Sequence, residues 1–160
     1  MKKDAIIDQS RKYRYSLSRI WDQSLKKVVF IMLNPSTADA LEDDQTVRKC
    51  ISFAKRWNFG SLEIVNLFAY RATKPKDLKM ICKNGTFDPV GEKNDFYILE
   101  AIKNADKIVI AWGENSFCSR DSAVLTLLKN YKLYCLDTCK NGNPKHPLFL
   151  ALDTELKNYI

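Results

Sequence analysis

The chain alternates between short apolar runs and longer amphipathic stretches. Residues 28–33, VVFIML, form a continuous apolar run that is typical of a strand buried on both faces of a parallel sheet. Comparable runs at residues 62–68, 107–112 and 132–136 predict three further strands. Residues 13–21, YRYSLSRIW, alternate apolar with polar positions instead, as expected of a half-exposed strand at an edge.

Stretches with helical spacing separate these strands. Val47 and Ile51 share one face of a helix predicted over residues 44–57, and either Asp43 or Asp44 supplies its N-cap. A short helix or turn is expected at residues 74–82, and further helices at residues 94–104, 119–130 and 148–159.

This order of elements predicts an α/β fold. Strands that alternate with helices form βαβ units, which place helices on both faces of a parallel sheet. We therefore expect a three-layer α/β/α architecture with a central, mainly parallel four-stranded sheet and an N-terminal edge strand or hairpin. The 160 residues suit one domain, so a single domain is expected over residues 1–160.

Composition narrows the possible partners. The net charge of +7 favours an anionic partner, most commonly nucleic acid, so we expect DNA or a nucleotide to bind. No apolar run reaches the ~20 residues of a membrane span, and the N-terminus lacks the apolar stretch of a secretory signal. We expect a cytoplasmic monomer with no membrane or protein partner.

The chain contains five cysteines, an odd number, and no CxxC pair. In a cytoplasmic protein this pattern predicts reduced, mostly structural thiols, and neither a metal site nor a cofactor is expected. The five are Cys50, Cys82, Cys118, Cys135 and Cys139.

Polar residues stand where the predicted central strands end, and a late loop holds the only histidine. The carboxyl ends of parallel strands meet at one edge of a sheet, so these residues are expected to share a cleft. Asparagine amides offer both donor and acceptor and can recognise a planar heterocycle, while the histidine can stabilise charge on a carbonyl oxygen. The candidates are Asn34, Pro35, Ser36, Asn66, Trp112, Gly113, His146 and Pro147.

Each candidate also has a structural interpretation. Asn34 can shape the turn before a proline, Asn66 can satisfy backbone groups at a strand end, and His146 can be a solvated loop residue. Arg71 follows the second strand and can contact a phosphate. A further set of acids favours a helix N-terminus, with a magnesium site as the alternative. These acids are Asp39, Glu42, Asp43 and Asp44.

The chain resembles two families. Seven motifs look like those of a bacterial and phage family catalogued as domain of unknown function 1643, which assigns no activity. They occupy residues 14–22, 30–39, 43–50, 65–73, 89–95, 111–113 and 145–150.

The order of motifs is also similar to that of the uracil-DNA glycosylase superfamily. The resemblance implies that Asn34-Pro35 positions water, Asn66 reads the base edge and His146-Pro147 stabilises the departing base. Arg71 would hold phosphates, and Asp39 or Asp43 would be an auxiliary carboxylate. The implied activity is an N-glycosidase that releases a damaged or modified base from DNA, in repair or modification.

The late loop departs from the glycosylase pattern. It continues as Leu148-Phe149-Leu150 without the usual serine, so either Leu148 or Phe149 enters the duplex, or both are buried in the last helix. Asn34 has no carboxylate, so it can orient water but not deprotonate it. The alternatives are a non-catalytic nucleic-acid or nucleotide-binding module, acting as a sensor or inhibitor, and a hydrolase of free modified nucleotides.

The positions of six lysines would distinguish DNA from a free nucleotide as the substrate. A cluster of six around one cleft would favour DNA, whereas a small closed pocket would favour a free nucleotide. The six are Lys26, Lys27, Lys74, Lys76, Lys140 and Lys145.

Overall fold

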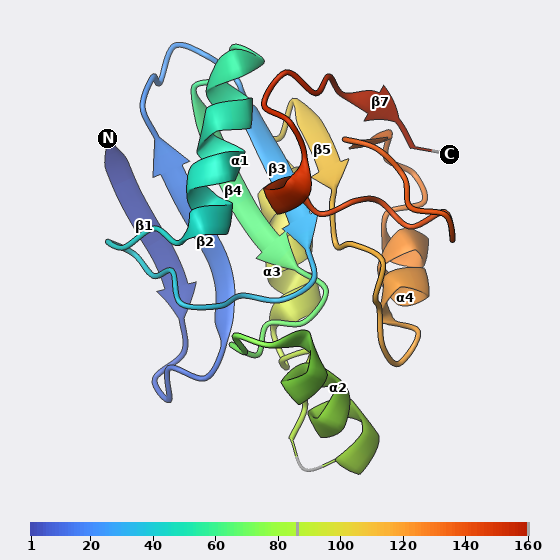
Figure 1. The fold of residues 1–160 in the computed structure, drawn as a ribbon. Helices are drawn as coiled ribbons and strands as arrows, with labels where there is room; N and C mark the ends of the chain where they lie inside the picture. The colour runs from blue at the N-terminus through green and yellow to red at the C-terminus, as the bar shows by residue number, and fades with distance from the viewer. Residues whose placement is uncertain (86, 160) are drawn as a thin grey trace.

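Seven strands form one sheet in the computed structural model, which describes residues 1–85 and 87–159 (Figure 1). Across the sheet the strands follow the order β1-β2-β4-β3-β5-β6-β7. Their bounds are β1 Lys2–Ile7, β2 Arg14–Ile20, β3 Lys27–Met32, β4 Ser61–Asn66, β5 Lys107–Ile110, β6 Leu133–Cys135 and β7 Lys157–Asn158.

The four strands predicted from the apolar runs are neighbours in the centre of this sheet. β4, β3, β5 and β6 pair in parallel, which confirms an α/β fold. The complete sheet is mixed and larger than expected. An antiparallel hairpin, β1 and β2, extends it beyond β4, and β7 pairs antiparallel with β6 at the opposite edge.

The segment expected to form a terminal helix does not form one. Residues 147–149 make a single 3-10 turn, η1 (Pro147–Phe149), and the chain then runs on to β7. The Thr154 carbonyl accepts a hydrogen bond from the Trp57 indole, and the Tyr159 N–H donates to Leu133 on β6. The predicted helix is wrong because the tail finds its hydrogen-bond partners on the open edge of β6 rather than within itself.

Helices cover both faces of the sheet. Side chains of β3 alternate between two apolar clusters: Phe30 packs with Phe53 of α1, and Ile31 packs with Ile98 of α3 and Val124 of α4. Both faces of β3 are covered by apolar clusters, which is why residues 28–33 are apolar throughout. The helices are α1 Gln45–Arg56, α2 Pro75–Asn84, α3 Asn94–Ile102 and α4 Arg120–Leu127.

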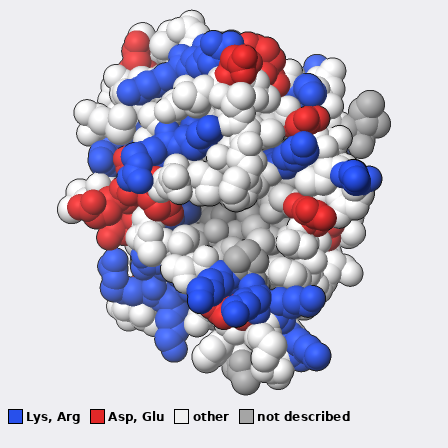
Figure 2. Space-filling model, in the orientation of Figure 1, with Lys and Arg blue, Asp and Glu red and all other residues white. Residues whose placement is uncertain are grey.

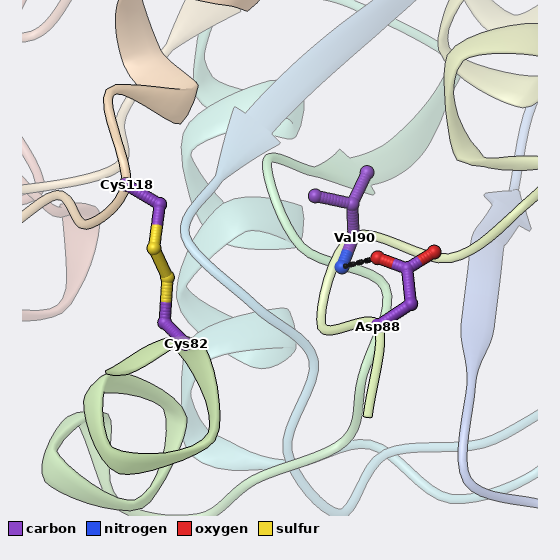
Figure 3. Close-up of a disulfide and its surroundings, with 4 residues drawn as sticks. All are labelled: Cys82, Asp88, Val90 and Cys118. Carbon is purple, nitrogen blue, oxygen red and sulfur yellow. Dashed lines mark hydrogen bonds between the residues drawn. A yellow bond between two sulfur atoms is a disulfide. The ribbon is translucent and has the colours of Figure 1, made fainter. Parts of the chain in front are cut away.

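A disulfide joins α2 to the loop before α4 (Figure 3). Cys82 and Cys118 are 36 residues apart in the sequence, and their Cα atoms are 6.6 Å apart. The expectation of reduced thiols is therefore wrong for this pair, because only the fold brings two such distant positions together. Cys50 and Cys135 are free and buried, as expected of structural thiols.

Candidate nucleotide-binding cleft

A cleft of about 790 Å³ lies at the carboxyl ends of β3 and β5. Its walls come from the loop after β3, the first residues of α1, the loop after β5 and the segment around η1. This is the edge at which open α/β sheets bind ligands. The volume is within the range typical of small-molecule sites.

The cleft brings six of the predicted site residues together and leaves five outside its lining. Those that line it are Asn34, Pro35, Ser36, Trp112, Gly113 and His146. Those that do not are Asp39, Asp43, Asn66, Arg71 and Pro147.

Asn34 links two of the loops at this edge. Its Nδ2 donates to the carbonyls of Pro35 at 2.9 Å and Ala72 at 2.7 Å, which uses both amide hydrogens. The side chain therefore shapes the turn and still lines the cleft. Only its Oδ1, an acceptor, remains for a ligand.

His146 is held in one orientation by its own loop. Its Nδ1 accepts the backbone N–H of Leu148 at 3.2 Å, so the neutral ring carries its proton on Nε2. Burial lowers the pKa of His146, although the charge of Asp44 opposes this shift. At neutral pH the residue is thus an uncharged imidazole with one N–H donor available.

Gly113 fixes the distance between this loop and the end of β5. Its N–H donates to the Pro144 carbonyl at 2.8 Å. Its φ of +90° is a conformation that strains any residue with a Cβ. A Cβ at this position would lie 3.7 Å from the Cβ of His146, so the two backbones pack directly against each other.

Asn66 is 1% exposed and lies at the end of β4, next to β3, whose carboxyl end lines the cleft. In the β3–β4 ladder its partner is Met32, which lines the cleft. Within the described part of the chain neither Nδ2 nor Oδ1 of Asn66 has a hydrogen-bond partner. Asn94 fixes the strand end from behind by donating to the carbonyls of Asn66 and Leu67.

The acids predicted for the site are bound elsewhere. Asp39 Oδ1 accepts the N–H groups of Leu41 and Glu42, and these hydrogen bonds lower its pKa. Asp43 pairs with the Arg19 guanidinium at 2.8 Å. Both carboxylates therefore hold the loop between β3 and α1.

Two other acids line the cleft, Asp44 and Glu114. Asp44 is the N-cap of α1, and its Oδ1 accepts the Val47 N–H at 2.9 Å. The sequence contained a signal for this position. An N-cap of α1 must lie where the loop from the end of β3 enters the helix, and this loop forms part of the cleft.

Arg71 and Pro147 support the cleft from outside its lining. The Arg71 guanidinium donates to the carbonyls of Ser36, Thr37 and Arg11, which ties the β3 loop to the N-terminal hairpin. Pro147 is buried in η1, directly after His146.

Arg14 also lines the cleft, and although it begins the motif at residues 14–22, nothing in the sequence marked it as a site residue. The side chain projects from β2 and the residue is 2% exposed. Its Nη1 donates to the Ala38 carbonyl at 3.2 Å, whereas its Nε has no partner among the described residues. Burial lowers its pKa to about 10, so the group is still charged at neutral pH.

The basic residues do not gather around this cleft. Of the six lysines singled out in the sequence only Lys145 lines it. Lys26 and Lys27, at the opposite end of β3, pair with Asp106 and Glu63. Figure 2 shows Lys and Arg in several separate groups, with Asp and Glu between them.

Over residues 1–85 and 87–159, no group of three or more His, Cys, Asp or Glu side chains is arranged to hold a metal ion. No helix in the part of the chain that the structure describes has the length and apolar character needed to cross a membrane.

Comparison with known proteins gives one match. The family model described as "Protein of unknown function (DUF1643)" matches residues 14–148, a span that runs from the start of β2 into η1 and includes all cleft-lining residues except Phe149 and Leu150. No curated protein and no solved structure matches the chain.

Proposed function

The chain thus belongs to the DUF1643 family, and we propose that its cleft binds a nucleobase-containing ligand and hydrolyses the N-glycosidic bond. The leading substrate is a damaged or modified nucleotide in DNA. The observation that carries this proposal is the buried, unpartnered amide of Asn66 beside the cleft. The resemblance of the motif order to that of uracil-DNA glycosylases, proposed from the sequence, favours it.

An amide buried without hydrogen bonds destabilises a protein by about 1 to 3 kcal/mol. Such a group is retained where a ligand supplies the missing partners. Asn66 offers a donor and an acceptor side by side, which matches the edge of a nucleobase. Its neighbour Met32 lines the cleft, so a base that enters beside Met32 approaches this amide.

His146 suits the bond-breaking step. Water oxygen bonds to the sugar C1′, the C1′–N bond breaks, and its electron pair leaves with the base. The Nε2–H of the neutral imidazole stabilises the negative charge that develops on the base. A charged imidazole is not required, which agrees with the lowered pKa.

Asn34 and Asp44 have different roles toward the attacking water: one orients it and the other accepts its proton. Asn34 Oδ1 accepts one water hydrogen and so orients the oxygen, since the Asn34 Nδ2 is already used. The water proton passes to a carboxylate that lines the cleft, and we assign this role to Asp44. Asp39 and Asp43 are less suitable, because N–H groups of its own loop hold the Asp39 carboxylate and Arg19 of β2 pairs with Asp43.

One residue at the cleft favours DNA as the source of the base. Phe149 lines the cleft and is 86% exposed. An exposed aromatic ring at this rim can enter a duplex and occupy the space of a flipped nucleotide, which offsets the few kcal/mol of unstacking.

The distribution of lysines favours a second candidate, a hydrolase of free modified nucleotides. A DNA-binding face requires several cations to contact successive phosphates. Only one of the six lysines considered lines the cleft, and Lys145 is itself within 3.8 Å of Asp137.

Base release tests the proposal directly. Oligonucleotides that contain uracil, hypoxanthine or modified pyrimidines are incubated with the protein and treated with alkali to cleave abasic sites. Free nucleotides with the same bases are followed by chromatography. Loss of the His146 donor is expected to reduce the rate by about 100- to 1000-fold in H146A, and N66A is expected to abolish release, with both variants folded.

Lys26→Ala, at the far end of the sheet, serves as the control and should keep full activity. Full activity in both site variants would refute the assignment of the site. Salt-sensitive DNA binding without any base release would favour the binding module instead.

A further inference from the structure

We propose that Arg14 forms a phosphate subsite in the wall of the cleft. This inference rests on the proposed function in one respect, the choice of a nucleotide's phosphate as the anion. The observations that carry it are the burial of Arg14, its place in the cleft lining and its unused guanidinium edge.

The unused edge has the geometry that oxyanions prefer. The one side-chain hydrogen bond of Arg14, among the residues described, runs from Nη1 to the Ala38 carbonyl. The Nε–H and one Nη2–H point the same way along another edge of the planar guanidinium. Together these two parallel N–H groups form a two-pronged donor. Such a fork binds two oxygens of one phosphate or carboxylate at once.

Arg19 shows that this chain can give every nitrogen of a buried guanidinium a hydrogen-bond partner. Its Nε donates to Asp43 Oδ1 at 2.8 Å and its Nη2 donates to the Asp39 carbonyl at 2.7 Å. Its Nη1 donates to the carbonyls of Asp4 and Ser18. The same two-pronged edge that binds a carboxylate and a carbonyl in Arg19 is therefore left open in Arg14.

The charge of Arg14 also lacks a direct partner. No carboxylate of the described residues lies within 4.0 Å of it, although Asp44 is close enough to favour its charged form. Burial of an unpaired charge is unfavourable, and a bound anion removes that cost. Arg71, Arg19 and Cys50 are the other groups that act on it electrostatically.

Three uncharged residues of the cleft lining agree with a phosphate, whereas the acids Asp44 and Glu114 also line the cleft and oppose one. Ser36 lines the same cleft and offers a hydroxyl. Gln45 and Thr46, the first residues of α1, also line it, and N–H groups at a helix start favour anions. A nucleotide that places its base beside Asn66 would carry its phosphate within the same cleft.

The test uses anions without a base, so its outcome does not depend on base recognition. Inorganic phosphate is titrated into the full chain, and the Nε–H resonances of the arginines are followed by NMR. We expect a saturable shift of the Arg14 signal and no shift of the Arg19 signal. Arg14→Gln and Arg14→Lys should each weaken phosphate binding by about 10-fold or more, because lysine keeps the charge but not the fork.

Arg48→Gln is the matched control, since Arg48 is exposed on α1 and does not line the cleft. It should change the affinity less than about 2-fold, within the effect of a surface charge. A titration that does not saturate, or equal weakening in the Arg14 and Arg48 variants, would overturn the subsite.

Two further probes distinguish the source of the phosphate. Tighter binding of deoxyribose 5-phosphate supports the subsite and assigns it to a free nucleotide. Tighter binding of dimethyl phosphate supports it and assigns it to a nucleic-acid backbone. Saturable phosphate binding at Arg14 in a protein that releases no base would leave the subsite standing and refute the N-glycosidase. Base release without any anion binding at Arg14 would support the N-glycosidase and refute the phosphate subsite.

Discussion

Arg14 and Arg19 lie on the same strand, β2, and are almost equally buried, yet their surroundings are opposite. Arg19 has four hydrogen bonds to protein acceptors, one of them to the Asp43 carboxylate. Among the described residues Arg14 has one, its Nε has no partner, and the residue lines a cleft. The difference separates a polar group that stabilises the fold from one that the fold leaves available for a ligand.

The largest expected effect is the loss of stability on substitution of Arg19, the arginine with four hydrogen bonds. Arg19→Met should lower the free energy of unfolding by about 3 to 5 kcal/mol, because Asp43 loses its buried partner and three carbonyls lose their donor. Urea denaturation followed by circular dichroism measures this. A loss below about 1 kcal/mol would contradict a stabilising role for Arg19.

The same substitution at Arg14 should have a much smaller effect. Arg14→Met removes one hydrogen bond to Ala38, but it also removes an unpaired buried charge, and these contributions oppose each other. We expect a free energy of unfolding within about 1 kcal/mol of the wild type. A loss as large as that of Arg19→Met, in the same denaturation experiment, would mean that Arg14 is structural.

Asn66 extends the comparison to an uncharged group. Asn66→Leu replaces an amide that has no partner among the described residues by an apolar side chain of similar size, so the free energy of unfolding should rise by about 1 kcal/mol. Binding and base release should be lost at the same time. Asn94→Leu is the contrasting control, since Asn94 donates to two carbonyls and its loss should destabilise the protein.

The smallest expected effect is the pH dependence that His146 contributes. Its pKa is lowered in the folded protein from the ordinary 6.5, so below that pH the unfolded chain binds the additional proton. The free energy of unfolding is therefore not reduced by His146 above pH 6.5. It declines as the pH falls from 6.5 toward the lowered pKa. His146→Gln should reduce the difference in unfolding free energy between pH 7.5 and 5.5. An unchanged difference would indicate that His146 does not titrate in this way.

Local patterns accounted for the centre of the fold. The four apolar runs became the parallel strands β3, β4, β5 and β6, because a strand covered on both faces must be apolar at every position. Asp44 was correctly placed as one of two possible caps of α1. The tail was not predictable in this way, since β7 depends on the free edge of β6.

Polar residues of the cleft were predictable only where they follow a central strand. Asn34, Trp112 and His146 line the cleft as expected from the convergence of strand ends. The sequence could not show which of two adjacent acids belongs to the cleft. Asp43 forms an ion pair with Arg19, whereas Asp44 lines the cleft. The direction of each carboxylate is set by the loop and by the start of α1.

The sequence by itself determined the central strands, the helix that follows β3 and the edge of the sheet at which polar residues collect. These features depend on periodicity and capping, which act over a few residues. The tertiary structure alone decided that Cys82 meets Cys118, that Arg19 is satisfied and that Arg14 is not. Those outcomes depend on strand pairing and on the shift in register that places Arg14 opposite Ile7, and such contacts between distant residues leave no local pattern in the chain.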